Sequence, residues 1–137
     1  MIRRGKTNAG DSWQTDKWIL DLVGNAFDPC PLDEGFCQLG NVLFDGLEMD
    51  WFYCSSDHNH HVFVNPPYSN PKPWVEKAIK ENKKGCFVVM LLKHDSSTKW
   101  FALLQEAGAH FLWCSRRLYH QSSRQCSFPS MLAVLPC

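Results

Sequence analysis

The amino-acid sequence predicts an α/β fold in which a mostly parallel sheet is flanked by helices. Short apolar segments alternate with amphipathic ones along the chain, which is the pattern of strands joined by crossover helices. Residues 86–92 form a continuous apolar run, as expected of a strand that is covered on both faces. The chain has 137 residues, so we expect one domain over residues 1–137, with residues 1–12 as a flexible arm.

In the first half of the chain, caps, turn residues and apolar runs delimit the elements. Thr15 is a suitable N-cap for a first helix, and Gly24 supplies its stop. Pro29 and Pro66 end two short strands, because proline cannot donate to a sheet ladder. The expected segments are a helix over 16–23, a strand over 26–29, an irregular Pro-, Gly- and Asp-rich stretch over 30–50, and a buried strand over 62–64.

The second half continues the alternation of helices and strands. Pro73 is suited to the first turn of a helix, and Thr98 to the N-cap of another. The expected segments are a helix over 73–82, a strand over 86–92, a helix from 99 to about 108, and strands over 109–113 and 131–135. The tryptophans expected in the core rather than on a base-stacking surface are Trp51, Trp74, Trp100 and Trp113.

Charge is balanced overall but unevenly distributed. The 14 basic and 14 acidic residues give a formal net charge of zero. Residues 18–71 hold eight acids and no Lys or Arg, whereas residues 72–137 hold ten bases and four acids. A polyanion would be attracted only to the second segment or to the basic N-terminal residues, although two solvated faces of one domain explain the same pattern.

Composition also bears on location and metals. The longest uninterrupted apolar run has seven residues, whereas a membrane span needs about 20, and no apolar stretch follows the basic N-terminus. We therefore expect no membrane segment and no signal peptide, and we interpret the seven cysteines as reduced thiols in a cytoplasmic protein. Cys54 and His58 have a spacing compatible with zinc, and further candidate ligands would be His60, His61, Cys30 and Cys37. Paired Cys-x-x-Cys knuckles are absent, so we expect a polar loop and no metal.

Asn65, Pro66, Pro67 and Tyr68 directly follow an apolar strand, at the edge where ligands bind in open α/β sheets. An amino group conjugated to a ring is a poor nucleophile because its lone pair is delocalised. The Asn65 side-chain oxygen and the Pro66 backbone oxygen can accept hydrogen bonds from such a group and localise that lone pair. The prolines restrain both acceptors, and Tyr68 can stack on the ring. The alternative is a proline-rich turn with Tyr68 as packing.

This tetrapeptide resembles the catalytic [Asp/Asn]-Pro-Pro-[Tyr/Phe] motif of amino-methyltransferases that use S-adenosylmethionine. More narrowly, nearly the whole chain is similar to the small phage-encoded DNA N-6-adenine-methyltransferases, the phage Dam family. The similar segments are, in order, residues 13–15, 27–30, 45–51, 64–68, 74–78, 88–92, 97–101, 117–118 and 128–131. The resemblance implies a small Rossmann-like methyltransferase fold, methylation of the N-6 amino group of a flipped-out adenine in DNA, and the host cytoplasm as location.

The resemblance also assigns roles to residues. It implies that Asn65, Pro66, Pro67 and Tyr68 hold the target adenine. It implies S-adenosylmethionine contacts from Trp13, Thr15, Asp28, Pro29, Asp45 and Asp50. The candidate phosphate contacts on DNA, for which surface solubility is the alternative, are Lys93, Lys99, Arg116, Arg117 and Arg124.

Two other functions remain open. The same motif holds a glutamine side-chain amide in protein methyltransferases, but those usually carry a glycine-rich loop and an extra N-terminal helical domain. A catalytically inactive methyltransferase fold could instead bind nucleic acid. The segment over residues 28–31, which replaces the glycine-rich loop, suits that function, whereas the intact motif at Asn65 argues against it. The sequence is compatible with a monomer or a homodimer and does not specify a recognition sequence.

Overall fold

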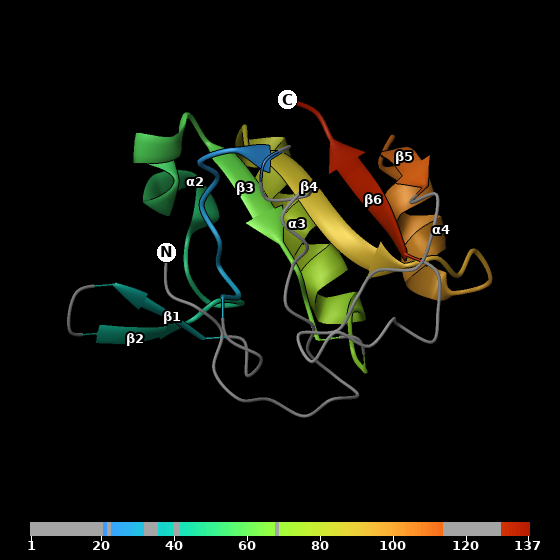
Figure 1. Cartoon of the computed structure of the whole chain (residues 1–137), viewed down its shortest axis with the longest axis horizontal. Helices are drawn as coiled ribbons and strands as arrows, with labels where there is room; N and C mark the ends of the chain where they lie inside the picture. Colours follow the sequence, from blue (N-terminus) through green and yellow to red (C-terminus); the bar gives the residue numbers. More distant parts are fainter. Residues whose placement is uncertain (1–20, 22, 32–35, 40–41, 68, 114–129) are drawn as a thin grey trace.

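The computed structural model describes residues 21, 23–31, 36–39, 42–67, 69–113 and 130–137. A four-stranded sheet with the order β3-β4-β6-β5 carries two helices, α3 and α4, on one face (Figure 1). A separate hairpin and a short helical segment precede this sheet in the chain. The elements are β1 (Phe36–Leu39), β2 (Val42–Asp45), α2 (Trp51–Cys54), η1 (Ser56–His58), β3 (His61–Val64), α3 (Lys72–Lys84), β4 (Phe87–Lys93), α4 (Lys99–Glu106), β5 (His110–Trp113) and β6 (Ser130–Leu135).

The sheet is mixed. β3 pairs with β4 in parallel, whereas β6 is antiparallel to both β4 and β5. Three of the four described strands therefore run in one direction, as predicted, but two of the three strand pairings are antiparallel because β6 lies reversed between β4 and β5. Antiparallel neighbours such as β5 and β6 need no crossover helix.

The strand expected over residues 26–29 is reduced to one bridge. Phe27 pairs in parallel with Val62: its amide donates to the His61 carbonyl at 2.8 Å, and its carbonyl accepts from the Phe63 amide at 2.9 Å. The Asp28 carboxylate then accepts a hydrogen bond from the Cys30 amide at 2.9 Å, which turns the chain. Pro29 has no amide to continue a ladder, so the segment leaves the sheet after a single pairing.

The prediction of no regular structure over residues 30–50 is wrong for the hairpin. β1 and β2 pair antiparallel, with Phe36 opposite Asp45 and Leu39 opposite Val42. Asp45 ends the hairpin, because its carboxylate accepts from the Leu47 amide at 2.9 Å and its carbonyl from the Glu48 amide. Pro, Gly and Asp are depleted in strands on average, and the two strands have only four residues each, so their pattern was too short to outweigh this composition.

The other expected elements are present. α3 includes Pro73 in its first turn and ends before Gly85, whose φ of 121° favours glycine. Thr98 caps α4 as predicted, because its side-chain oxygen accepts from the Phe101 amide at 3.3 Å. Within the helix expected over residues 16–23, only Asp21 and Val23 are described, and both are helical. No helix in the described parts of the chain is both long and apolar enough to span a membrane.

Alternation along the strands separates the core into two layers. Every second residue along each strand, such as Val64, Met90 and Ala133, packs in the main cluster with α3 and α4. The residues that alternate with them form a smaller cluster on the opposite face, consisting of Phe63, Val89, Leu91 and Leu132.

The tryptophans test the predicted core. Trp51, Trp74 and Trp100 are buried, as expected. The prediction is wrong for Trp113, which is 53% exposed. Trp113 is the last residue of β5, and β5 stands at the end of the strand order, so no further strand pairs beside it in the described sheet.

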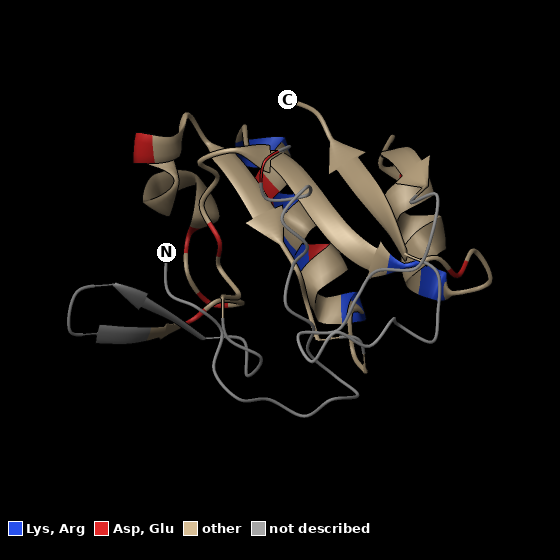
Figure 2. Cartoon of the chain, viewed as in Figure 1, with Lys and Arg blue, Asp and Glu red and all other residues tan. Residues whose placement is uncertain are grey.

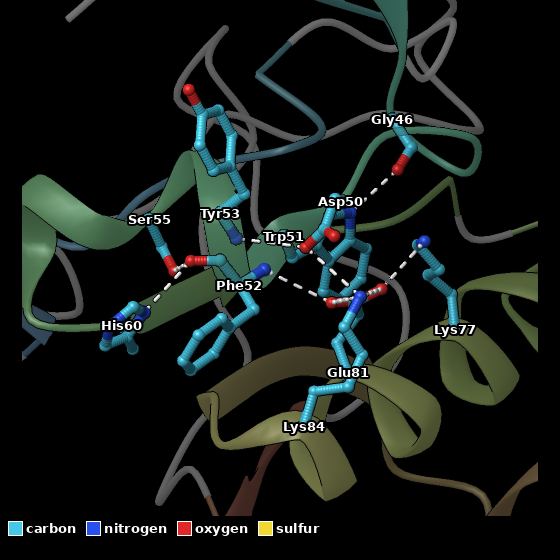
Figure 3. A network of polar contacts seen from close by, with 10 residues as sticks. All are labelled: Gly46, Asp50, Trp51, Phe52, Tyr53, Ser55, His60, Lys77, Glu81 and Lys84. Carbon is cyan, nitrogen blue, oxygen red and sulfur yellow. Dashed lines mark hydrogen bonds and ion pairs between the residues drawn. The ribbon is translucent and has the colours of Figure 1, made fainter.

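A polar network joins α2 to the end of α3 (Figure 3). The Glu81 carboxylate, 1% exposed, accepts from the Phe52 amide at 3.2 Å and pairs with Lys77 at 3.0 Å and Lys84 at 3.2 Å. Asp50 caps α2 by accepting from the Tyr53 amide at 2.9 Å and also pairs with Lys84, at 3.1 Å. A buried carboxylate is stable only when it is paired, so this network fixes α2 against α3.

Candidate active site

Asn65 and Pro66 lie at the carboxyl end of β3, inside the fold. Asn65 is 3% exposed, its Oδ1 atom is buried, and Pro66 is buried as well. β3 is held by β4 on one side, where Val64 lies opposite Met90, and by the Phe27 bridge on the other. The strand therefore fixes the position at which the two proposed acceptor oxygens leave the sheet.

The chain after Asn65 is restrained by its own turn. Pro67 is half-buried, and its carbonyl accepts from the Asn70 amide at 3.3 Å. The Pro71 carbonyl then accepts from the Val75 amide at 3.0 Å, at the start of α3. Two consecutive prolines and this turn limit the backbone freedom of the motif, as the sequence predicted. Tyr68 lies outside the described residues.

Two further polar residues share the sheet edge of Asn65. The β4–β6 register places Lys93 opposite Ser130, at the end of β4 and the beginning of β6. Leu91 lies two residues before Lys93 on β4, Leu132 lies two residues after Ser130 on β6, and both leucines belong to the second cluster. Strand alternation therefore places the side chains of Lys93 and Ser130 on the face opposite α3 and α4. Ser130 is 1% exposed, and its hydroxyl has no hydrogen-bond partner among the described residues. From the sequence, residues 128–130 were candidates for a tight turn near the substrate, with packing as the alternative; burial and register now place Ser130 at the beginning of β6.

Asp28 is the predicted cofactor residue that the structure brings to β3. It follows the Phe27 bridge by one residue and is half-buried, and the next residue, Pro29, is buried. One carboxylate oxygen accepts from the Cys30 amide at 2.9 Å. A half-buried carboxylate beside the strand that carries Asn65 is the kind of acceptor that a ligand with hydroxyl groups requires, so these residues fit S-adenosylmethionine.

Asp45 and Asp50 lie at the two ends of the turn that joins the hairpin to α2. Their carboxylates accept from the amides of Leu47 and Tyr53, respectively. The Tyr53 amide, together with the ammonium group of Lys84, holds the pKa of Asp50 below its usual range. Both residues thus have structural contacts, and their cofactor roles stay predictions. The remaining predicted cofactor residues, Trp13 and Thr15, lie outside the described residues.

The predicted charge asymmetry is visible in the fold. Figure 2 shows basic residues on α3, at the end of β4 and on α4, whereas acidic residues gather on the segments that precede β3. The two described candidates for phosphate contacts, Lys93 and Lys99, are exposed at the end of β4 and the start of α4. The other candidates, Arg116, Arg117 and Arg124, lie outside the described residues.

Two of the histidines considered for zinc, His58 and His60, make contacts within the fold. The Nδ1 atom of His58 lies 2.7 Å from the Asn25 carbonyl, and that of His60 lies 2.9 Å from the Phe52 carbonyl. The ring of His60 also stacks on Phe52 at 3.9 Å. In the described ranges, no three His, Cys, Asp or Glu residues gather as a metal site would require. Burial raises the pKa of the Cys86 thiol to about 11, so it stays protonated at neutral pH.

Comparisons with known proteins agree with the sequence motifs. The family model described as DNA N-6-adenine-methyltransferase (Dam) matches residues 4–127. A protein of Escherichia phage T1 named DNA N-6-adenine-methyltransferase is 30% identical over 105 residues, which cover 75% of this chain and 44% of the relative. A protein of the same name from Haemophilus phage HP1 (strain HP1c1) is 33% identical over 116 residues, covering 74% of this chain and 61% of the relative.

The chain therefore spans about half the length of these curated relatives. No solved structure matches the chain. The family predicted from the motif at Asn65 and the order of the surrounding segments is confirmed: the chain belongs to the DNA N-6-adenine-methyltransferase (Dam) family.

Proposed function

We propose that this protein transfers a methyl group from S-adenosylmethionine to the N-6 amino group of adenine in DNA. The observation that carries the proposal is the position of Asn65 and Pro66 at the carboxyl end of β3, in a chain of the Dam family. The chain spans 44% and 61% of these relatives, so the support for the activity comes from the chain's own residues.

Asn65 and Pro66 activate the amine. The Asn65 Oδ1 atom and the Pro66 carbonyl accept hydrogen bonds from the adenine amino group, which localises the nitrogen lone pair. The same two oxygens stabilise the positive charge that develops on that nitrogen. Both residues are buried, and a low local dielectric strengthens these hydrogen bonds. When bound, S-adenosylmethionine supplies an electrophilic methyl group, and no general base is needed because the amine can lose its proton to solvent afterwards.

Access to Asn65 requires displacement of its surroundings. At 3% exposure, its amide meets an adenine only when the base leaves the DNA stack and the groups that cover Asn65 move aside. Base flipping costs a few kcal/mol. Phosphate contacts from the exposed Lys93 and Lys99 would offset this cost.

Other residues at this edge complete the site. Asp28 and Pro29 hold the cofactor beside β3, and Tyr68 stacks on the target base. The Ser130 hydroxyl lies two strands from β3, roughly 10 Å at ordinary strand spacing, so it would contact the target nucleotide away from its amino group. A parallel β3–α3–β4 unit with ligand residues at its carboxyl edge supports a Rossmann-like methyltransferase fold.

The test is methyl transfer from labelled S-adenosylmethionine to DNA that lacks adenine methylation, with fully adenine-methylated DNA as the control. We expect label only in the first DNA, as N-6-methyladenine. Equal labelling of both DNAs would reject adenine as the target. Label in protein glutamine would favour the protein methyltransferase, and no affinity for S-adenosylmethionine in a binding titration would favour the inactive nucleic-acid-binding module.

A further inference from the structure

Four aromatic rings form a continuous stack from the core to the surface. Phe101 of α4 is buried, and its ring lies 4.6 Å from that of Phe111 with an interplanar angle of 15°. Phe111 lies 6.0 Å from Trp113 at 7°, and Trp113 lies 4.1 Å from His94 at 26°. The first ring is therefore anchored among core residues, whereas the last two, Trp113 and His94, are exposed.

The anchoring distinguishes Trp113 from an ordinary exposed apolar side chain. Single exposed apolar residues are common and need no explanation. Here, the two rings that flank the indole, Phe111 and His94, already hold it in one orientation. A ring that is preorganised in this way loses little conformational entropy when a planar ligand stacks on it.

The stack reaches the surface at the same end of the sheet as Asn65, but on the face covered by α3 and α4, because Phe111, two residues before Trp113 on β5, packs against the main cluster. Trp113 and Leu92 both lie opposite Met131, so Trp113 is level with the carboxyl end of β4. Three strand spacings separate β3 from β5, roughly 14 Å in total. This distance corresponds to about four nucleotide steps along a DNA strand, each of about 3.4 Å.

The residues beside the exposed rings carry positive charge. Lys99 begins α4, and Lys93 precedes His94 with its side chain on the other face of the sheet; both side chains are exposed. The one acid of the intervening loop, Asp95, accepts hydrogen bonds from the amide and the hydroxyl of Ser97. Exposed aromatic rings with neighbouring lysines are the combination that binds single-stranded nucleic acid, by stacking on bases and attracting phosphates.

We propose that Trp113 and His94 form a stacking platform for an unpaired nucleobase of DNA, a few nucleotides from the adenine at Asn65. The platform rests on the proposed function, because it takes DNA as the ligand. It adds a contact that no residue of the candidate active site supplies, namely stacking on a base other than the target adenine. Stacking tolerates any base, so the platform contributes affinity rather than sequence recognition.

The experiment compares variants of the full chain in binding to a labelled single strand of about 12 nucleotides, within the usual site sizes. Replacing Trp113 by Ala is expected to weaken binding about five- to 150-fold, the equivalent of ~1–3 kcal/mol for one stacked base. Trp113→Phe keeps most of the affinity, and Trp113→Leu loses it. On a fully abasic strand of the same length, wild type and Trp113→Leu should bind equally, because no base is present to stack.

Tyr53→Ala is the matched control. Tyr53 is 77% exposed on α2, which lies at the opposite end of the sheet from β5 (Figure 1), so this variant should bind as wild type does. Equal affinities of the Phe and Leu variants of Trp113 would overturn the platform. That pair remains informative even if Trp113→Ala fails to fold, because both replacements keep apolar bulk.

The outcomes separate the platform from the proposed function. If the protein methylates adenine but Trp113→Leu binds DNA as wild type does, only the platform is rejected. If DNA binding depends on Trp113 but no methyl transfer occurs, the platform stands and the methyltransferase proposal fails. A wild-type protein that binds no DNA at all would reject both.

Discussion

The two ends of the sheet differ in whether their buried polar groups have hydrogen-bond or ion-pair partners. At the amino end, the buried Glu81 carboxylate is matched by two lysines and an amide, and Asp50 is matched by an amide and a lysine. At the carboxyl end, the buried hydroxyl of Ser130 has no partner in the described part of the chain, and Lys93 and Trp113 are exposed. Satisfied groups stabilise a fold, whereas unsatisfied buried groups and exposed rings cost stability and are available for a ligand.

This contrast predicts that substitutions at the amino end change stability and that substitutions at the carboxyl end change activity. The strongest test is Glu81→Ala. It removes the carboxylate that pairs with the Lys77 ammonium group and accepts from the Phe52 amide. We therefore expect the free energy of unfolding to fall by about 3–5 kcal/mol. Urea unfolding monitored by circular dichroism measures the change.

Glu76→Ala is the matched control on the same helix. Glu76 is exposed, and its loss should change the free energy of unfolding by no more than about 0.5 kcal/mol. A loss below about 1 kcal/mol for Glu81→Ala would show that the network does not hold the amino end together.

Ser130→Ala tests the carboxyl end with two measurements of opposite sign. Removing a buried hydroxyl that has no partner among the residues described by the structure should raise the free energy of unfolding by about 1 kcal/mol. The same change should lower kcat/KM for methyl transfer roughly tenfold, because the hydroxyl finds its partner in the bound nucleotide. Unchanged kcat/KM would assign Ser130 to packing alone.

Asp50 offers a smaller, pH-dependent test of the amino end. Asp50→Ala removes the N-cap of α2 and should cost about 1 kcal/mol near neutral pH. Asp50→Asn keeps a capping oxygen, so the asparagine variant should remain closer to wild type. Urea unfolding of the three proteins at neutral pH measures both effects.

The sign of the pH dependence follows from the lowered pKa of Asp50. A carboxyl whose pKa is depressed by folding stabilises the fold above its ordinary pKa of 3.8 and loses this contribution as the pH falls through the folded value. Wild type should therefore lose its advantage over Asp50→Asn in acid. An advantage that grew on acidification would contradict the Tyr53 amide and Lys84 as partners of the charged form.

Sequence patterns predicted the elements that local chemistry determines. β4 was predictable because seven consecutive apolar residues fit a strand covered on both faces, and α3 and α4 because Pro73 and Thr98 mark their starts. The position of Asn65 after a buried strand was predictable because an apolar run directly precedes it.

Features that depend on distant pairing were not predictable. The reversal of β6 and the exposure of Trp113 follow from the strand order, which no single segment encodes. The position of Ser130 beside Lys93 depends on a pairing between residues 37 positions apart in the chain. The Phe27 bridge shows the same limit, since a run of strand-forming residues does not specify how many of them pair.

The central claim is that Asn65 activates the adenine amine chemically and does not merely support the fold. Single-turnover methyl transfer by Asn65→Ala, measured together with its affinity for S-adenosylmethionine, tests this most directly, with Asn65→Asp as a variant that keeps an acceptor oxygen. We predict a rate about 10²–10³-fold below wild type for the alanine variant, with cofactor affinity and far-ultraviolet circular dichroism unchanged. An Asn65→Ala protein that transferred methyl groups at the wild-type rate would contradict the account.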